Sequence, residues 1–176
     1  MKTIERNKIT SKLFRKNIRD KDFNKEFEKI FEIKIKDFLS EYEYDEIDEF
    51  PIEIESRGIM IGFSAETIKM PAQIEYIDLE VRHYPQNIAY LSKEIPLNFN
   101  IKNSEDFARH LTPFNNLKIY YSLYNQKQLD RTVFQYEDLR YELSLTVDGV
   151  ISRIRVCFAE DESNINMRTY YLFDNV

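Results

Sequence analysis

The chain has 176 residues, 43% hydrophobic and 14% aromatic, which supplies enough apolar surface for one domain with a core and argues against wholesale disorder. Its three glycines, Gly58, Gly62 and Gly149, are too few for a glycine-rich phosphate loop, and its single cysteine, Cys157, excludes an intrachain disulfide and indicates a reducing compartment. The formal net charge is −6, but residues 1–25 carry nine basic and three acidic groups, so the rest of the chain carries −12.

The N-terminal part is predicted to be helical in two pieces. The first covers residues 11–19 and is rich in lysine and arginine. The second follows an aspartate cap at Asp20 or Asp22 and reaches about residue 42, because its apolar side chains recur at helical spacing. We expect this apolar stripe to pack on a β-sheet.

An acidic segment follows the second helix. Over residues 41–50, six of the ten residues are acids, interleaved with aromatic and aliphatic side chains. Most charge runs are solvated linkers, but a linker seldom carries so many large apolar groups, which in an interface supply buried anchors while carboxylates steer the approach. A second acidic loop follows the C-terminal hairpin. The candidate partner-binding residues are Glu41, Tyr42, Glu43, Tyr44, Asp45, Glu46, Asp48, Glu49, Glu160, Asp161 and Glu162.

The middle of the chain is predicted to form strands. Apolar residues alternate at residues 52–54, 59–63 and 73–84, and the doublet Tyr76-Ile77 indicates a bulge in the third run. Further along, the sequence predicts a turn at residues 85–87, an irregular edge strand over 88–101, a short helix over 105–111, a strand over 117–124 and a last strand over 166–173, with 129–138 open between helical turn and strand.

The best-determined element is a β-hairpin over residues 139–158. Asp148-Gly149 lies between two alternating apolar runs, which is a strong signal for a two-residue turn. That turn opposes Val147 to Val150 and predicts the further pairs Thr146–Ile151, Leu145–Ser152, Ser144–Arg153, Leu143–Ile154, Glu142–Arg155, Tyr141–Val156, Arg140–Cys157 and Leu139–Phe158.

The two faces of this hairpin differ in polarity. One is apolar at nearly every position, and the other is polar and expected to be wet, with a cross-strand ion pair between Glu142 and Arg155. These patterns together predict an α+β fold with N-terminal helices packed on one face of a mainly antiparallel sheet that ends in a hairpin or meander. The expected division is a basic N-terminal arm with a short helix over residues 1–21 and a single α+β domain over residues 22–176.

No catalytic or metal-binding pattern stands out. His83 and His110 have no second ligand at metal spacing, and the sequence around Ser64 lacks the second glycine of a nucleophile elbow. The alternating acids between residues 75 and 80 are typical of the wet side of a strand rather than of a nuclease centre. Cys157 has no nearby base in sequence. We therefore expect no catalytic residue, no metal and no cofactor.

Nucleic-acid binding is an alternative that the sequence leaves open. The polar side of the C-terminal sheet gathers arginines and one stacking aromatic, and the basic N-terminal segment adds charge. The acidic body argues against it, because it repels phosphates. The residues of this alternative are Arg140, Arg153, Arg155, Arg168 and Tyr170.

The sequence thus favours a protein that acts by contact. The hypothesis is a small acidic inhibitor of immunity or anti-CRISPR type that binds a basic partner, such as a bacterial nuclease, toxin or CRISPR effector, by occlusion. We expect a cytoplasmic protein, since no apolar run reaches the length of a membrane span and the N-terminus does not resemble a signal peptide.

Overall fold

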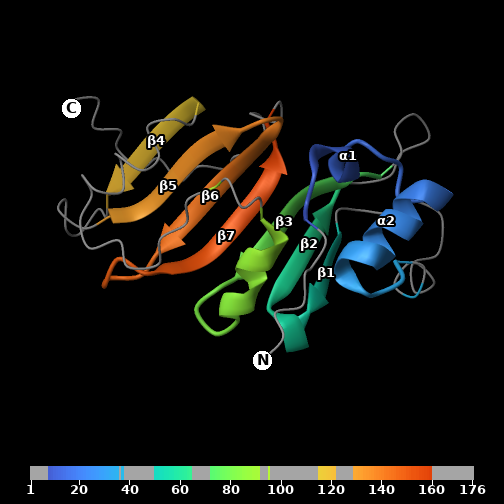
Figure 1. Ribbon diagram of the computed structural model, residues 1–176, viewed down its shortest axis with the longest axis horizontal. Coiled ribbons are helices and arrows are strands. Elements are labelled where there is room, and N and C mark those ends of the chain that lie inside the picture. The colour runs from blue at the N-terminus through green and yellow to red at the C-terminus, as the bar shows by residue number, and fades with distance from the viewer. Residues whose placement is uncertain are drawn as a thin grey trace.

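The computed structural model describes residues 8–35, 37, 50–64, 72–91, 95, 115–121 and 129–159. These residues form one seven-stranded sheet with short helices, so the predicted α+β class is confirmed (Figure 1). The elements in chain order are α1 (Ser11–Phe14), α2 (Lys21–Phe31), β1 (Phe50–Ile54), the 3-10 helix η1 (Glu55–Arg57), β2 (Ile59–Phe63), β3 (Ile74–Glu80), the 3-10 helix η2 (Pro85–Tyr90), β4 (Asn115–Tyr121), β5 (Leu129–Tyr136), β6 (Leu139–Leu145) and β7 (Ile151–Phe158).

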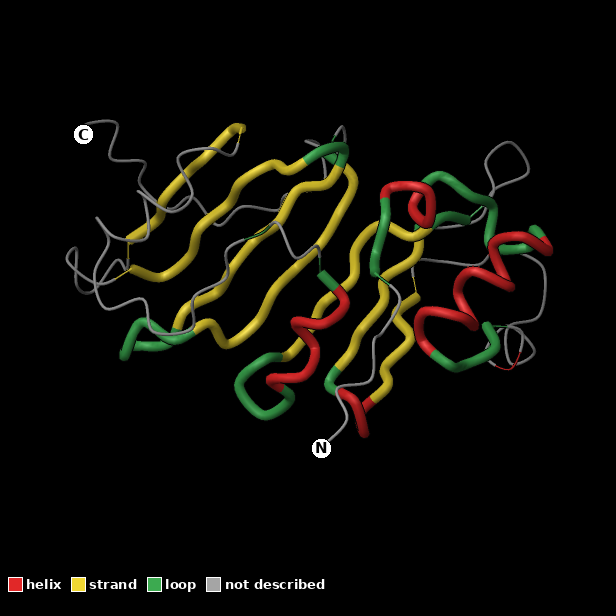
Figure 2. Tube along the Cα trace, in the orientation of Figure 1, coloured by secondary structure: helices red, strands yellow, loops and turns green. Residues whose placement is uncertain are grey.

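The sheet consists of two meanders joined through β3 and β7. Its order is β1-β2-β3-β7-β6-β5-β4, and every neighbouring pair is antiparallel. Strands that follow one another in sequence are therefore neighbours, except β3 and β4, and the central pair joins β3 to the later strand β7. Figure 2 shows the described helices gathered around β1 to β3, whereas the half formed by β4 to β7 is a plain set of strands in this view.

The core lies on one side of the sheet. Transverse pairing aligns buried residues of five strands in one row, namely Ile61, Ile77, Val156, Tyr141 and Phe134. Side chains alternate between the two faces along each strand, so the next row on the same face lies two residues away. These rows together form a continuous apolar layer. The buried stripe of α2 belongs to the same hydrophobic cluster.

The second helix is shorter than predicted. It ends at Phe31, because Glu32 takes the left-handed conformation (φ 57°) and its N–H donates to the Glu28 carbonyl. Arg57 of η1 donates from Nη1 to the Phe31 carbonyl at 2.6 Å and pairs with Glu32 at 3.1 Å. A side chain from a distant turn thus caps the helix. The prediction of one continuous helix to residue 42 is therefore wrong at residues 32–35, where the helix is interrupted; Asp37 is helical again, and residues 36 and 38–42 lie outside the described set.

The segment expected to be a basic arm contributes to this core from Ile9 onward. Ile9, Leu13, Phe14 and Ile18 are buried in the common cluster, and the Ile9 N–H donates to the Tyr90 carbonyl at 2.8 Å. Its basic side chains lie between these apolar positions, several of them exposed. Residues 1–7 lie outside the described residues.

The hairpin register is confirmed over most of its length. Leu139 to Ser144 face Phe158 to Arg153, as predicted. The turn differs, because it is a three-residue loop in which Gly149 (φ 74°) is left-handed and its N–H donates to the Thr146 carbonyl at 2.9 Å. Among residues 147–149 only the glycine has positive φ, so this is a type I turn followed by a glycine bulge.

A bulge in β7 restores the register. Leu145 faces Ile151 and Ser144 faces Arg153, so Ser152 is the extra residue. The predicted pairs Leu145–Ser152 and Thr146–Ile151 are therefore wrong, as is Val147–Val150, because the Thr146 N–H donates to the Val150 carbonyl. The shift places Ile151 in the core, where it is fully buried. The Ser152 carbonyl accepts the Val81 N–H at 2.8 Å, which ties the bulge to the end of β3.

The remaining elements agree with the sequence in part. The bulge expected at Tyr76-Ile77 lies at Glu75, because Gly62 faces Tyr76 while Phe63 faces Ile74. The 3-10 helix η2 replaces the start of the edge strand predicted from residue 88. Residues 129–136 form a strand, and β4 ends at Tyr121. The predicted helix 105–111 and strand 166–173 lie outside the described residues. No helix in the described part of the chain is long and apolar enough to cross a membrane.

Candidate functional site

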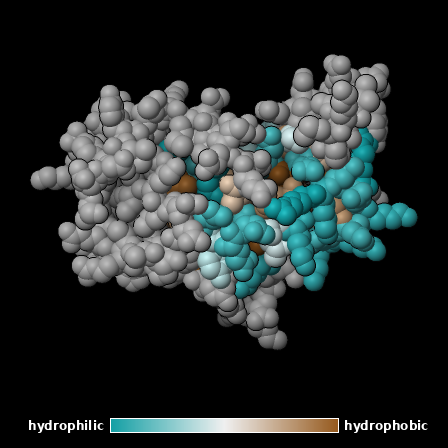
Figure 3. All heavy atoms as spheres, turned by 90° about the horizontal axis from the view of Figure 1, so that it is seen from above, coloured by the Kyte–Doolittle hydropathy of each residue, from teal (hydrophilic) through white to brown (hydrophobic). Residues whose placement is uncertain are grey.

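The acidic segments predicted to bind a partner lie outside the described residues. This applies to residues 41–49 and 160–162 and, in the alternative site, to Arg168 and Tyr170. What the structure gives is the body that carries these segments. In the view from above, its visible side chains are mostly hydrophilic, with apolar ones in small spots (Figure 3).

The negative charge comes from these two acidic segments. The rest of the chain contains 22 acidic and 25 basic side chains, so the net charge of −6 is due to residues 41–49 and 160–162. Residues 41–49 hold six acids and no base, and residues 160–162 hold three acids. Negative charge is thus concentrated in the segments that the sequence singled out.

The polar side of the sheet carries a network of ion pairs. Arg155 stands opposite both Asp78 and Glu142, but it pairs with Asp78, through Nε and Nη2 at 2.7 Å each. Glu142 instead accepts from Nη1 of Arg131 on β5 at 2.9 Å. The predicted Glu142–Arg155 ion pair is therefore wrong, because each residue has a partner on its other side. The side-chain hydrogen bonds that Arg155 donates to Asp78 are the main reason why the pKa of Arg155 is raised.

This side of the sheet is drier than predicted. The side chains of Arg131 and Glu142 are each only 13% exposed and that of Asp78 is 7% exposed, while Val133 on the same side is buried. Arg155 also lies over the Tyr76 ring, 4.3 Å from its centroid. The expectation of an open, wet face is thus wrong for the middle of the sheet.

Arg140 and Cys157 face one another in the predicted register. Arg140 is half-buried, and Cys157 is buried with its thiol directed to the Arg140 carbonyl at 3.8 Å. Burial raises the pKa of the Cys157 thiol, against the smaller opposing effect of Arg140. A protonated, buried thiol is a poor nucleophile, so this cysteine has the environment of a structural residue.

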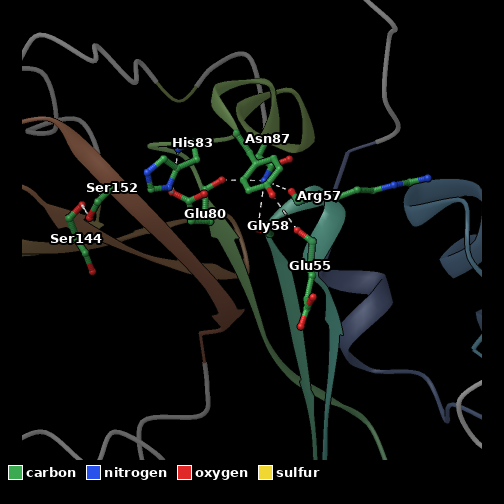
Figure 4. Close-up of polar contacts among 9 residues, drawn as sticks. Glu55, Arg57, Gly58, Glu80, His83, Asn87, Ser144 and Ser152 are labelled. Carbon is green, nitrogen blue, oxygen red and sulfur yellow. Dashed lines mark hydrogen bonds and ion pairs between the residues drawn. The ribbon is translucent and has the colours of Figure 1, made fainter.

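A buried amide fixes the corner between β1–β2 and β3 (Figure 4). Asn87 of η2 is fully buried, and its Nδ2 donates to the carbonyls of Arg57 and Glu80 at 2.8 Å each. The ring of Tyr84 lies against Gly58, and its hydroxyl donates to the Glu55 carbonyl at 2.9 Å. Sequence reasoning missed this clamp, because its contacts to Glu55 and Arg57 join residues about thirty positions apart.

No metal centre is built by the described residues, since they contain no group of three or more histidine, cysteine, aspartate or glutamate side chains that could hold an ion. His83 is exposed and has one carboxylate beside it, with Nδ1 at 3.2 Å from Oε1 of Glu80. The same oxygen accepts the His83 backbone N–H at 3.0 Å. The contacts between Glu80 and His83 join residues three positions apart, so they belong to a local turn. His110 lies outside the described residues.

Comparison with known proteins adds no relative: no protein-family model, no curated protein and no solved structure matches this chain.

Proposed function

We propose that this protein is an acidic, protein-binding inhibitor of immunity or anti-CRISPR type, directed at a basic partner such as a bacterial nuclease, toxin or CRISPR effector. The observation that carries the proposal is the concentration of negative charge in two segments, residues 41–49 and 160–162, while the rest of the chain has slightly more basic than acidic side chains. A charge excess spread over the whole surface would suggest a solubility effect, whereas concentrated acids suit recognition of a cationic surface.

The mechanism would be occlusion. Carboxylates attract the basic partner, and Tyr42 and Tyr44 supply the large side chains that anchor an interface once water is expelled. The rigid sheet provides the scaffold, since β1 begins directly after the first acidic segment and β7 ends just before the second. On this proposal the chain transforms no substrate and works in the cytoplasm.

Nucleic-acid binding is less well supported. Its main arginine, Arg155, already holds a bidentate carboxylate, and Arg131 beside it holds Glu142. Phosphate contacts need cations that are free to replace counterions. These internal pairs therefore weaken the alternative.

The test is charge reversal of the first acidic segment. A triple variant, Glu43→Lys, Asp45→Lys and Glu46→Lys, is compared with the wild-type chain for capture of proteins from a bacterial lysate. Each captured protein is then purified, and its affinity and its own activity are measured. We expect a basic partner that is inhibited at saturation and binds the triple variant roughly 100-fold more weakly.

A matched control separates recognition from overall charge. Glu28, Glu53 and Glu137 are exposed acids of the body, and reversing all three changes the net charge by the same amount. This control should keep its affinity within a few-fold. Equal losses in both variants, or a partner whose activity is unchanged at saturation, would remove the proposal. Binding of a single-stranded oligonucleotide at low salt, lost as salt rises, would favour the alternative.

A further inference from the structure

The two acidic segments join the described fold at the same end of the sheet. The first, residues 41–49, leads into Phe50 at the start of β1, and the second, residues 160–162, follows Phe158 at the end of β7. Strands β1 and β7 run in opposite directions, because three antiparallel pairings separate them. The start of β1 therefore lies at the same end of the sheet as the finish of β7 (Figure 1).

The register places these two attachment points close together. Phe50 faces Phe63 and Phe63 faces Ile74, while Tyr76 of β3 faces Cys157 of β7. The start of β1 and the finish of β7 thus lie in almost the same transverse row. Three strand spacings of about 4.8 Å separate them, which amounts to about 14 Å across the sheet.

Contacts of the segment around α1 hold this end of the sheet together. The Ile18 N–H donates to the Ala72 carbonyl, just before β3, at 3.2 Å. The Arg15 guanidinium lies 4.1 Å from the centroid of the Phe158 ring at the end of β7. The Ala159 N–H donates at 3.0 Å to a carbonyl of the turn between β5 and β6. The spacing of the two attachment points is therefore a property of the folded body.

Acids outnumber bases at this end of the molecule. The two segments hold nine acids, whereas residues 12–19 hold four basic groups. Residues 15–18 pass from the end of β7 to the start of β3, so they lie between the two attachment points. Arg15 is exposed there, and Lys16 pairs with Glu26 at 2.6 Å. A partner therefore meets carboxylates on two sides of a cation, which suits two basic clusters and repels a phosphate backbone.

The short separation also decides how many partners can bind. A standard interface covers about 800 Å² on each protein, which corresponds to a patch roughly 30 Å across. Two proteins with interfaces of this size would collide if each bound at one of two points about 14 Å apart. One protein with such an interface covers both points.

We propose that residues 41–49 and 160–162 form one composite acidic surface, which a single basic protein contacts through two clusters of lysine or arginine side chains at once. This inference rests on the proposed function for the class of partner, and it adds that the contact has two parts. Once the first cluster is bound, the second contact is intramolecular. The joint affinity therefore exceeds the affinity of either segment alone.

The test uses a probe with the same design. Two tetralysine blocks are joined by an eight-residue glycine–serine linker, whose root-mean-square span is about 16 Å, and this bivalent probe is compared with a single tetralysine block. Isothermal titration calorimetry at low salt measures affinity and stoichiometry. We expect one bivalent probe per chain, bound at least roughly tenfold more tightly than the single block.

This gain in affinity should depend on both segments. The triple lysine variant of the first segment should lose it, and so should a second variant that combines Glu160→Lys, Asp161→Lys and Glu162→Lys. The matched control reverses Glu53, Glu55 and Asp148, three exposed acids toward the opposite end of the sheet, and should keep the gain. The inference fails if the gain survives reversal of residues 160–162, if two bivalent probes bind one chain, or if the control loses the gain as well.

The composite surface and the proposed function fail in different ways. An inhibited lysate partner that depends on the first segment but binds the variant of residues 160–162 as tightly as the wild-type chain would support the proposed function and overturn the composite surface. Linked binding of the bivalent probe by a chain that captures no inhibited partner would support the composite surface and remove the proposed function.

Discussion

Arg155 and Asp78 form a bidentate ion pair between β7 and β3, the two strands that join the halves of the sheet, with both N···O distances at 2.7 Å. The carboxylate is almost fully buried and the guanidinium is partly exposed. Because β3 and β7 are far apart in sequence, this contact helps to fix one meander against the other.

Asp78→Asn should destabilise the protein by about 2–3 kcal/mol, less than for a fully buried pair because solvent screens the exposed part of Arg155. The measurement is the free energy of unfolding in urea. Glu53→Gln is the matched control, since Glu53 is exposed in the same transverse row, and it should change stability by less than about 0.5 kcal/mol. Equal effects would show that the ion pair contributes nothing specific.

Gly62→Ala should cost about 1–3 kcal/mol, because a Cβ at this position would overlap the Tyr76 ring. The backbone at Gly62 does not require glycine, as its φ is not positive. In a Tyr76→Ala background the same substitution should therefore be neutral or mildly stabilising. A double-mutant cycle by thermal or urea unfolding checks this. An unchanged cost in that background would mean that the overlap is not the cause.

Asn87→Asp should be more harmful than Asn87→Ala. The amide nitrogen of Asn87 faces backbone carbonyls in a fully buried site. Aspartate replaces this N–H donor by an oxygen, which would face the carbonyl oxygens as a further acceptor. We expect a loss of about 2 kcal/mol for alanine and more for aspartate. Hydrogen exchange of residues 55–58 should accelerate in both variants. A milder effect of aspartate would contradict the clamp.

Gly149→Ala should cost about 1–2 kcal/mol, since an alanine rarely adopts φ near 74°. Val147 in the same loop is 79% exposed, so Val147→Thr should leave stability unchanged and serves as the control. Urea unfolding of both variants is the measurement. If Gly149→Ala were as mild as Val147→Thr, the left-handed residue would not matter for the hairpin.

Alkaline pH should weaken the fold. Burial raises the pKa of both Cys157 and Tyr141, so the unfolded chain releases these protons at a lower pH than the folded chain does. The free energy of unfolding has its full value below the ordinary pKa of a thiol and falls above about pH 8.5. Each of the two groups lowers it by up to about 1.4 kcal/mol per pH unit. Urea midpoints between pH 7 and 10 measure it. Cys157→Ala with Tyr141→Phe should flatten the slope, and an unaltered slope would point to other groups.

The sequence predicts the fold well where contacts are local. The Leu139–Ser144 side of the hairpin follows from alternation and one turn signal, and the strands follow from their apolar period. The turn type was wrong because two irregularities, one at Gly149 and one at Ser152, cancel in register. No local signal distinguishes that pair from a plain two-residue turn.

The candidate site was less predictable, because it depends on which strands become neighbours. Asp78 and Arg155 are 77 residues apart, and alternation alone cannot tell that β7 lies beside β3. Without that neighbour, Glu142 looked like the natural partner of Arg155. The same holds for Arg57 at the end of α2, which shortens the predicted helix. Long-range pairing supplies what the local pattern lacks.

The position of β7 between the two meanders also sets the order in which the molecule can assemble. β7 is the last described strand in the chain, yet it pairs with β3 at the junction of the two meanders. A nascent chain can form the β1–β3 meander early on the ribosome. The two meanders cannot pair with each other until residues 151–158 have left the ribosome. Until then the sides of β3 and β6 that pair with β7 would be open to pairing with strands of other chains. A delay in synthesis just before Ile151 should therefore increase misassembly.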